Sequence, residues 1–148
     1  MQRIVNLTPD IAVTGELQPD DLAQVAALGF RSLVNNRPDG EDEGQLPAEL
    51  ARDIATSLGL AYHHLPVRGY DVSDEDVVDA FAKLSAGLKG PVLYYCRSGT
   101  RCTLLWAQSA APRLGVEAVT AIAARAGYDV SVVRDEMEER AAIATQAA

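Results

Sequence analysis

Short apolar runs alternate along the chain with longer segments in which apolar residues recur every three or four positions. The short runs predict strands at residues 11–13, 32–35, 60–67 and 91–95. The last run, PVLYY, is continuously apolar, which is typical of a strand that is buried on both faces. Because strands that alternate with helices favour parallel pairing, the pattern predicts a mainly parallel sheet covered by helices.

Six segments show helical periodicity: residues 19–29, 47–58, 74–88, 103–114 and two stretches between residue 116 and about residue 144. Pro19 suits the first position of a helix, and Gly59 suits the position just after one. Ser73 is the expected N-cap of the third helix, whose first turn is acidic. The polar stretch at residues 35–44 (NNRPDGEDEG) indicates a loop.

The chain contains no internal repeat, linker or low-complexity tract that would divide it. Its 148 residues, of which 48% are apolar, are enough to bury a substantial core. We therefore predict a single α/β domain over residues 1–148. The expected architecture is a three-layer sandwich around a mainly parallel central sheet.

The formal net charge of −8 argues against a nucleic-acid or anionic-membrane binder, because such proteins need a basic face. No run approaches the roughly 18 consecutive apolar residues of a membrane span. The N-terminus lacks the basic-then-apolar order of a signal peptide, and two cysteines do not make a secreted disulfide framework. We therefore expect a cytoplasmic protein with neither a nucleic-acid nor a membrane partner.

Two adjacent histidines, His63 and His64, are the only ones in the chain. They fall on an expected strand and therefore face opposite sides, which is poor geometry for one metal ion. Two cysteines without histidines at matched spacing also do not complete a four-ligand metal site. We assign no metal and no cofactor.

The segment with the most chemical information is PVLYYCRSGTRCT, residues 91–103. Cys96 directly follows a buried strand, and a helix begins a few residues later. Such a loop lies in the crevice beyond the carboxyl ends of a parallel sheet, where its N–H groups and the helix dipole favour an anion. These surroundings can lower the pKa of a thiol from about 8.5 to roughly 3.5–7.5. Cys96 is therefore a candidate nucleophile, although a buried cysteine can also be a small core residue.

The residues that follow Cys96 would complete an anion site. Arg101 can return its planar guanidinium to an oxyanion held over the loop, so we expect a catalytic role for it with Cys96. A tight loop with converging N–H groups usually needs a positive φ, which explains a glycine. The expected substrate-binding residues are Arg97, Ser98, Gly99 and Thr100.

These motifs resemble known families. CRSGTR resembles the active-site loop of rhodanese-type sulfurtransferases, and a cysteine and arginine between strand and helix resemble the loop of cysteine-based tyrosine and dual-specificity phosphatases. The stretches LTPDIAVTGEL, GFRSLVNNRPDGE, HLPV and YCRSGTR followed by TLLWA resemble the phosphatase-like domain of beta-lactamase-hydrolase-like proteins. That resemblance covers most of residues 4–135 and implies a dual-specificity-phosphatase-like α/β fold. The family is labelled both as phosphatase and as sulfur transferase.

The loop length separates these two reactions. Tyrosine phosphatases typically have His before the cysteine and five residues between it and the arginine. This chain has Tyr95 and only four intervening residues. Because a persulfide is smaller than a phosphoryl group, we predict a sulfurtransferase that forms a Cys96 persulfide from a small anionic sulfur donor. A phosphatase with a phosphocysteine intermediate is the alternative, and a non-catalytic anion-binding module is the second alternative.

The general acid of a phosphatase would come from the segment PVRGYDVSD. Dual-specificity enzymes often carry an aspartate directly after Pro-Val, where this chain has Arg68. Asp71 is the nearest carboxyl group, and it could equally be an ordinary turn residue. Arg68 would help to hold an anionic donor, so this segment also favours sulfur transfer.

Two further residues have open roles. Cys102 could resolve an oxidised or persulfidated Cys96 as an internal disulfide, or it could be a small core residue in the first turn of a helix. Arg37 could reach the site from a neighbouring strand end, or it could form a surface salt bridge with the acidic residues beside it.

Overall fold

Residues 1–147 are described by a computed structural model of the chain. The strands are β1 (Val5–Thr8), β2 (Ile11–Thr14), β3 (Ser32–Asn35), β4 (Ala61–His64) and β5 (Val92–Tyr95). The helices are α1 (Pro19–Ala27), α2 (Ala48–Ser57), α3 (Glu75–Ala86), α4 (Thr100–Leu114), α5 (Val116–Arg125) and α6 (Arg134–Ala147). Two short 3-10 helices, η1 (Gly69–Asp71) and η2 (Ser131–Val133), lie between them.

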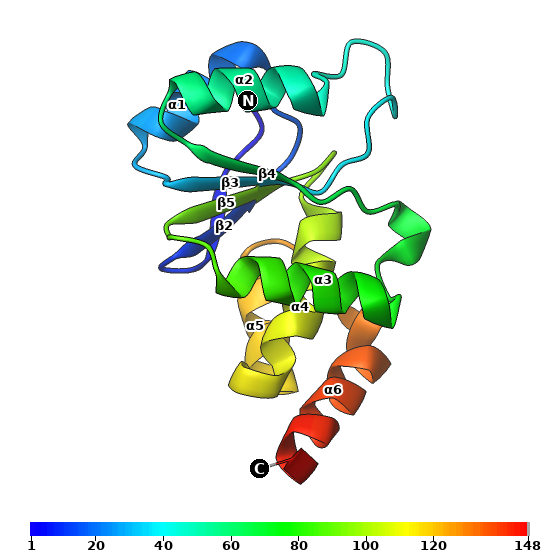
Figure 1. Cartoon of the computed structure of the whole chain (residues 1–148). Coiled ribbons are helices and arrows are strands. Elements are labelled where there is room, and N and C mark those ends of the chain that lie inside the picture. The colour runs from blue at the N-terminus through cyan, green and yellow to red at the C-terminus, as the bar shows by residue number, and fades with distance from the viewer. Residues whose placement is uncertain (148) are drawn as a thin grey trace.

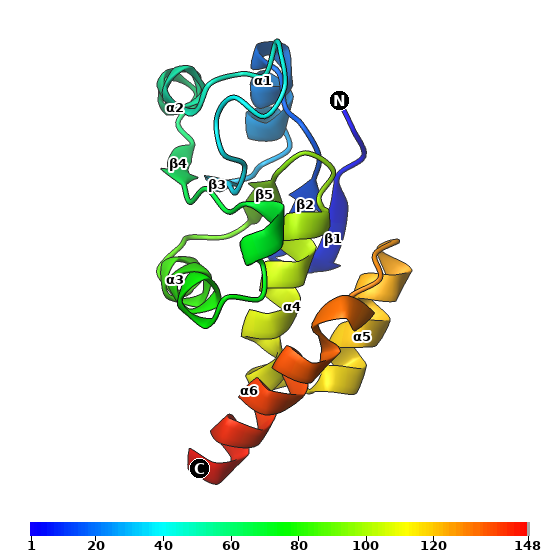
Figure 2. The same ribbon diagram turned by 90° about the vertical axis from the view of Figure 1, so that its right-hand side faces the viewer.

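The strands form one sheet in the order β1-β2-β5-β3-β4. All neighbouring pairs are parallel except β1 and β2, which pair antiparallel. Helices α1 and α2 cover one face of the sheet, and α3 to α6 lie on the other (Figures 1 and 2). The expected three-layer α/β sandwich with a mainly parallel sheet is therefore confirmed.

The central strand β5 shows how the sequence builds both cores. Its alternate residues Val92 and Tyr94 pack with the core under α3 to α6, while Leu93 and Tyr95 pack with the core under α1 and α2. All four are buried, as expected for a strand covered on both faces. Cys96 continues this alternation and points into the first core. The alternation along β5 thus places the Cys96 side chain in the core between the sheet and α4.

Four local predictions differ from the structure. The strand expected at residues 60–67 spans only Ala61–His64, since Pro66 has no N–H group to donate to a sheet. Strand β1 was missed, because its residues Val5–Thr8 (VNLT) include two polar positions and the strand lies at an edge of the sheet. Asp74 rather than Ser73 is the N-cap of α3, and its carboxylate accepts hydrogen bonds from the N–H groups of Asp76 and Val77. Helix α4 begins at Thr100 rather than at residue 103, since Gly99 is already its N-cap.

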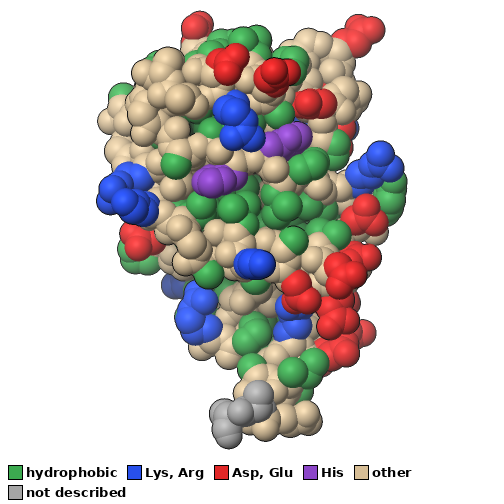
Figure 3. Space-filling model, viewed as in Figure 1, with side chains coloured by type: hydrophobic (Ala, Val, Ile, Leu, Met, Phe, Trp, Pro, Cys, Tyr) green, Lys and Arg blue, Asp and Glu red, His purple; other side chains and the backbone are tan. Residues whose placement is uncertain are grey.

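Charged side chains are distributed unevenly over the surface. Figure 3 shows acidic side chains gathered on one side of the helical layer, where the first turn of α3 carries Glu75 and Asp76. Acidic residues of α6 add to this charge, and Arg134 pairs with Glu138 along that helix. Among residues 1–147, no helix is both long and apolar enough to span a membrane.

Candidate active site

The site lies at the edge of the sheet where β2, β5 and β3 all end, because parallel strands present their carboxyl ends together. Cys96 follows β5 and is 1% exposed, and the loop that begins there leads into α4. Gly99 has φ of 88°, a value that favours glycine, and turns the chain into the helix. The N-terminus of α4 therefore faces the cysteine sulfur, as the loop pattern predicts.

Several donors converge on the sulfur of Cys96. The N–H group of Gly99 lies 3.1 Å from Sγ and donates a hydrogen bond to it. The Cys102 thiol has the largest effect on the pKa of Cys96, and the N–H groups of Cys102, Ser98 and Gly99 add to it. Although burial opposes them, these donors lower the pKa of Cys96 to about 6. The sulfur is therefore a thiolate at neutral pH, which is the nucleophilic form.

Cys102 occupies the core position that was one of its two expected roles, and its role in resolving an oxidised Cys96 stays a prediction. It is completely buried in the core beside α4, as a small core residue would be. A hydrogen-bond effect of its thiol is also the largest cause that lowers the pKa of Cys96. Burial is the main cause that raises the pKa of Cys102 well above 9, and the Cys96 sulfur adds to it. Cys102 therefore remains a protonated donor, and both cysteines are free.

Arg101 is held by two groups outside the loop, which the sequence did not predict. Its two terminal nitrogens donate to the two carboxylate oxygens of Glu41, each at 2.9 Å, and Nη1 also donates to the Val67 carbonyl at 2.9 Å. The hydrogen bond from Arg101 is the largest cause that lowers the pKa of Glu41. Glu41 was missed in the sequence because it lies in a polar loop sixty residues away from Arg101.

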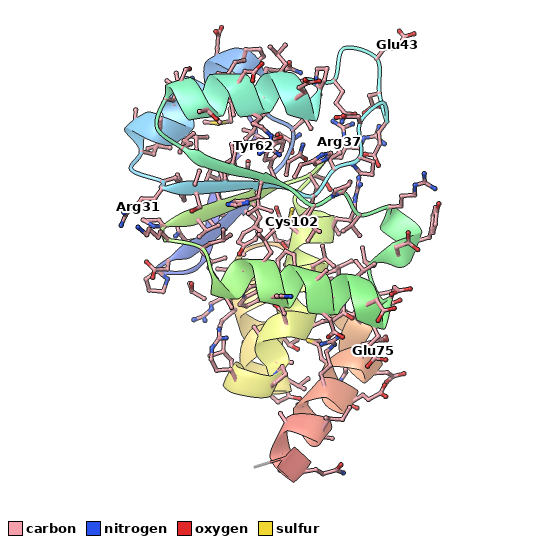
Figure 4. All side chains as sticks on the ribbon, in the orientation of Figure 1. Arg31, Arg37, Glu43, Tyr62, Glu75 and Cys102 are labelled. Atoms are coloured by element: carbon pink, nitrogen blue, oxygen red, sulfur yellow. The ribbon has the colours of Figure 1, made fainter. Side chains whose placement is uncertain are left out.

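Arg37 is buried, with 2% of its side chain exposed, which corrects the expected surface salt bridge. Its guanidinium pairs with Glu41 at 2.9 Å, with Asp42, and with Glu16 at 3.4 Å. The predicted pairing with neighbouring acids is thus present, but inside the molecule. Figure 4 shows Arg37 beside the loop that follows β3 and Cys102 near the start of α4. Through Glu41, Arg37 supports the position of Arg101.

The other predicted binding residues lie at the mouth of the loop. The Arg97 side chain is 65% exposed, and its Nε lies 3.2 Å from a carboxylate oxygen of Asp42. Ser98 and Thr100 are also exposed, and their hydroxyl groups hydrogen-bond to each other at 3.1 Å. The side chains of these residues are therefore exposed on the loop, while backbone N–H groups meet the sulfur.

Arg68 and Asp71 belong to a segment that is fastened to α4 on both sides. Arg101 holds the Val67 carbonyl, and Gln108 donates to the Val72 carbonyl at 2.7 Å. Between these anchors, Arg68 is exposed and donates to the Tyr70 hydroxyl at 2.7 Å. Asp71 is half-buried in η1. The structure thus brings the segment alongside α4, but Arg68 pairs with Tyr70 rather than with the loop.

Another contact was not expected from sequence. Tyr128, which follows α5, donates from its hydroxyl to the Ser98 carbonyl at 3.2 Å. His64 has a supporting contact, with Nε2 2.8 Å from the Arg37 carbonyl, and is half-buried like His63. Within residues 1–147, no group of three or more His, Cys, Asp or Glu side chains is arranged to hold a metal ion.

Known proteins share sequence and fold with this chain. Residues 3–113 match the model of the phosphatase-like domain of beta-lactamase hydrolase-like proteins. The chain belongs to this family. A beta-lactamase hydrolase-like protein from Xylella fastidiosa is 33% identical over 141 residues, and one from Agrobacterium fabrum is 32% identical over 104 residues. These matches cover 94% and 70% of the chain but only 32% and 24% of those two relatives.

Solved structures of the same fold agree with this membership. A Neisseria meningitidis protein described as a candidate phosphatase has a TM-score of 0.81 and 31% identity, with 93% of this chain and 97% of that one covered. P. aeruginosa TpbA has a TM-score of 0.66 at 17% identity, which reflects the fold alone, over 97% of this chain and 91% of its own. The expected phosphatase-like fold is confirmed, and this domain is a phosphatase-like member of its family.

Proposed function

We propose that this phosphatase-like domain is a cysteine-dependent phosphatase that acts on small phosphate monoesters. The observation that carries the proposal is the buried Cys96 sulfur, which receives converging hydrogen bonds at the N-terminus of α4 and has its pKa lowered to about 6. The phosphatase-like family and fold support phosphoryl transfer over the predicted sulfur transfer. The same donors that stabilise the thiolate would receive the phosphoryl oxygens.

The reaction would proceed in two displacements. The Cys96 thiolate attacks phosphorus, an S–P bond forms, and the ester P–O bond breaks as the leaving oxygen takes a proton from the carboxyl group of an acid–base residue. A water molecule then attacks phosphorus, loses a proton to the same acid–base group, and breaks the S–P bond. Inorganic phosphate and the Cys96 thiolate result. Asp71 is the proposed acid–base group, because its segment is anchored to α4 through Val67 and Val72.

Arg101 would bind the phosphate without leaving Glu41. A guanidinium has five N–H donors. The contacts with Glu41 and Val67 use three of them, which leaves two donors for an anion. Glu41 therefore keeps the planar group in place while its free edge meets the phosphate. This arrangement explains how a paired arginine can still recognise substrate.

Sulfur transfer is the second candidate, and the short Cys96–Arg101 spacing favours it. The Cys96 thiolate would attack the outer sulfur of thiosulfate, the S–S bond would break, and sulfite would leave with the bonding electron pair. A Cys96 persulfide would remain until a thiolate acceptor removed its outer sulfur. The Cys102 thiol beside Cys96 could donate a hydrogen bond to that persulfide, and no general acid is needed.

One experiment separates these reactions. The protein is incubated with para-nitrophenyl phosphate or phosphotyrosine, and separately with thiosulfate and a thiol acceptor, while released phosphate and sulfite are measured. We expect phosphate release that is lost in Cys96→Ser and retained in Cys102→Ser, which keeps a donor beside Cys96. Sulfite release without phosphate release would replace the phosphatase proposal by the sulfurtransferase. Phosphate binding without turnover of either substrate would contradict both and leave an anion-binding module.

The pH dependence provides a second measurement. Because the thiolate is the active form and its pKa is about 6, both turnover and iodoacetamide alkylation should fall as the pH is lowered through about 6. An unperturbed thiol would lose reactivity near roughly pH 8.5 instead. A midpoint near that value would show that the loop does not activate Cys96.

A further inference from the structure

Tyr128 connects the C-terminal helices to the reactive loop. It lies beyond residues 3–113, the segment that matches the family, and follows the turn that ends α5. Its hydroxyl donates to the Ser98 carbonyl at 3.2 Å. The same oxygen would lie 2.2 Å from a Cβ atom added to Gly99, so it is packed directly against the loop backbone. The contact is close enough to control the conformation of the loop.

The hydrogen bond from Tyr128 acts on one peptide group. In a trans peptide, the carbonyl oxygen and the N–H group point in opposite directions. The carbonyl of the Ser98–Gly99 peptide faces Tyr128, while the N–H group of the same peptide donates to Cys96 Sγ at 3.1 Å. A donor on the carbonyl side therefore turns the N–H group toward the sulfur.

The preceding peptide is held in the same way. The Arg97 carbonyl accepts hydrogen bonds from the Glu16 N–H group at 3.2 Å and from the Gln2 side-chain amide at 3.1 Å. The N–H group of this peptide belongs to Ser98 and also lowers the pKa of Cys96. Two successive carbonyls thus point away from the sulfur, and each is held by a donor from a distant part of the chain.

We propose that Tyr128 is a positioning residue that sets the orientation of the Ser98–Gly99 peptide and thereby stabilises the Cys96 thiolate. Glycine at position 99 has access to more backbone conformations than other residues, so this peptide can rotate when its carbonyl has no partner. Rotation would replace a donor near the sulfur by a carbonyl oxygen, which disfavours negative charge. Burial, together with the nearby Cys96 and Cys102 sulfurs, raises the pKa of Tyr128, which keeps its hydroxyl protonated as a donor.

In this proposal, different segments of the chain supply the nucleophile and control its reactivity. Residues within the family-matched segment supply the nucleophile and Arg101, whereas the segment after α5 controls how reactive the nucleophile is. The inference rests on the proposed role of Cys96 as nucleophile. Its test measures the thiolate itself, so its outcome does not depend on which substrate is turned over.

The test compares Tyr128→Phe with the parent protein. The substitution removes the hydroxyl and keeps the ring, and the pKa of Cys96 is read from the pH dependence of its iodoacetamide alkylation in a Cys102→Ser background. We expect the pKa to rise by roughly half to one unit, as the loss of one hydrogen bond predicts. Tyr94→Phe is the matched control, because its hydroxyl bonds to Ser85 rather than to the loop.

An unchanged pKa in Tyr128→Phe would overturn the inference, as would an equal rise in Tyr94→Phe. A lower melting temperature with no pKa change would assign Tyr128 a purely structural role and contradict the proposal. Turnover gives a further readout, since the variant should lose activity at low pH and recover it at high pH. If the parent hydrolyses no phosphate ester but the pKa still rises in Tyr128→Phe, the proposed function fails while this inference stands.

Discussion

The close approach of Tyr128 to Gly99 makes Gly99→Ala an informative perturbation. Gly99 has φ of 88°, and an added Cβ would lie 2.2 Å from the Tyr128 hydroxyl oxygen and 3.1 Å from its Cζ. The new methyl group therefore meets two separate obstacles. One is the backbone conformation, which is unfavourable for alanine, and the other is the tyrosine side chain.

The two obstacles have different magnitudes. Placing a residue with a Cβ in a left-handed conformation costs about 1 kcal/mol. Because Tyr128 contacts the position through the end of a flexible side chain, it can move away, but it then loses its hydrogen bond to Ser98. That loss adds about 1 kcal/mol. We expect Gly99→Ala to lower the free energy of unfolding by about 2 kcal/mol in total, and to raise the pKa of Cys96.

The assay is urea unfolding of the parent, Gly99→Ala, Tyr128→Phe and the double variant. The hydrogen bond to Ser98 can be lost only once, so the double variant should be less destabilised than the sum of the single variants by about 1 kcal/mol. Gly29→Ala is a matched control, because Gly29 has φ of 94° and no neighbouring atom within 4 Å of an added Cβ. It should show only the backbone cost of about 1 kcal/mol.

Two results would refute this reasoning. Additive effects of Gly99→Ala and Tyr128→Phe would show that the tyrosine is not what the new methyl group displaces. Equal destabilisation by Gly99→Ala and Gly29→Ala would show that backbone strain accounts for the whole effect.

Three other sets of substitutions test separate parts of the structure. Glu41→Gln should lower kcat roughly tenfold, because an amide cannot accept all the hydrogen bonds of the carboxylate that holds Arg101. An unchanged kcat would show that Glu41 does not position Arg101. Cys102→Ala should raise the alkylation pKa of Cys96, whereas Cys102→Ser, which keeps a donor, should raise it less; equal values would exclude the hydrogen bond as the cause. Asp74→Ala should lower the free energy of unfolding in urea by about 1 kcal/mol, because the helix loses its N-cap. Ser73→Ala should lower it by only about 0.3 kcal/mol, and the reverse order would contradict the observed cap.

Local sequence patterns were sufficient for most of the fold. The apolar run at residues 91–95 identified the central strand, and glycine and proline positions marked helix ends, because these signals act between near neighbours in the chain. Strand β1 escaped prediction, since an edge strand with two polar positions has no strong pattern of its own. It becomes a strand because it can pair with β2.

The candidate site divides in the same manner. Sequence alone identified Cys96 and the loop to Arg101, because a cysteine between a buried strand and a helix is a contiguous signal. It did not identify Glu41 or Tyr128, and it left open whether Arg37 reaches the site or forms a surface salt bridge. These residues reach the loop only after the chain has folded. A local sequence pattern does not predict such contacts between residues that are distant in the chain.

Sequence by itself therefore determined the layered α/β architecture and predicted Cys96 as the candidate nucleophile. Tertiary structure decided how the pKa of Cys96 is lowered, through the Cys102 thiol and through N–H groups whose peptide carbonyls are held by Gln2, Glu16 and Tyr128. The physical reason is the distance along the chain over which each interaction acts. Strand and helix formation depend on neighbours in the chain, whereas the pKa of a buried thiol depends on every donor and charge that folding brings within a few ångströms.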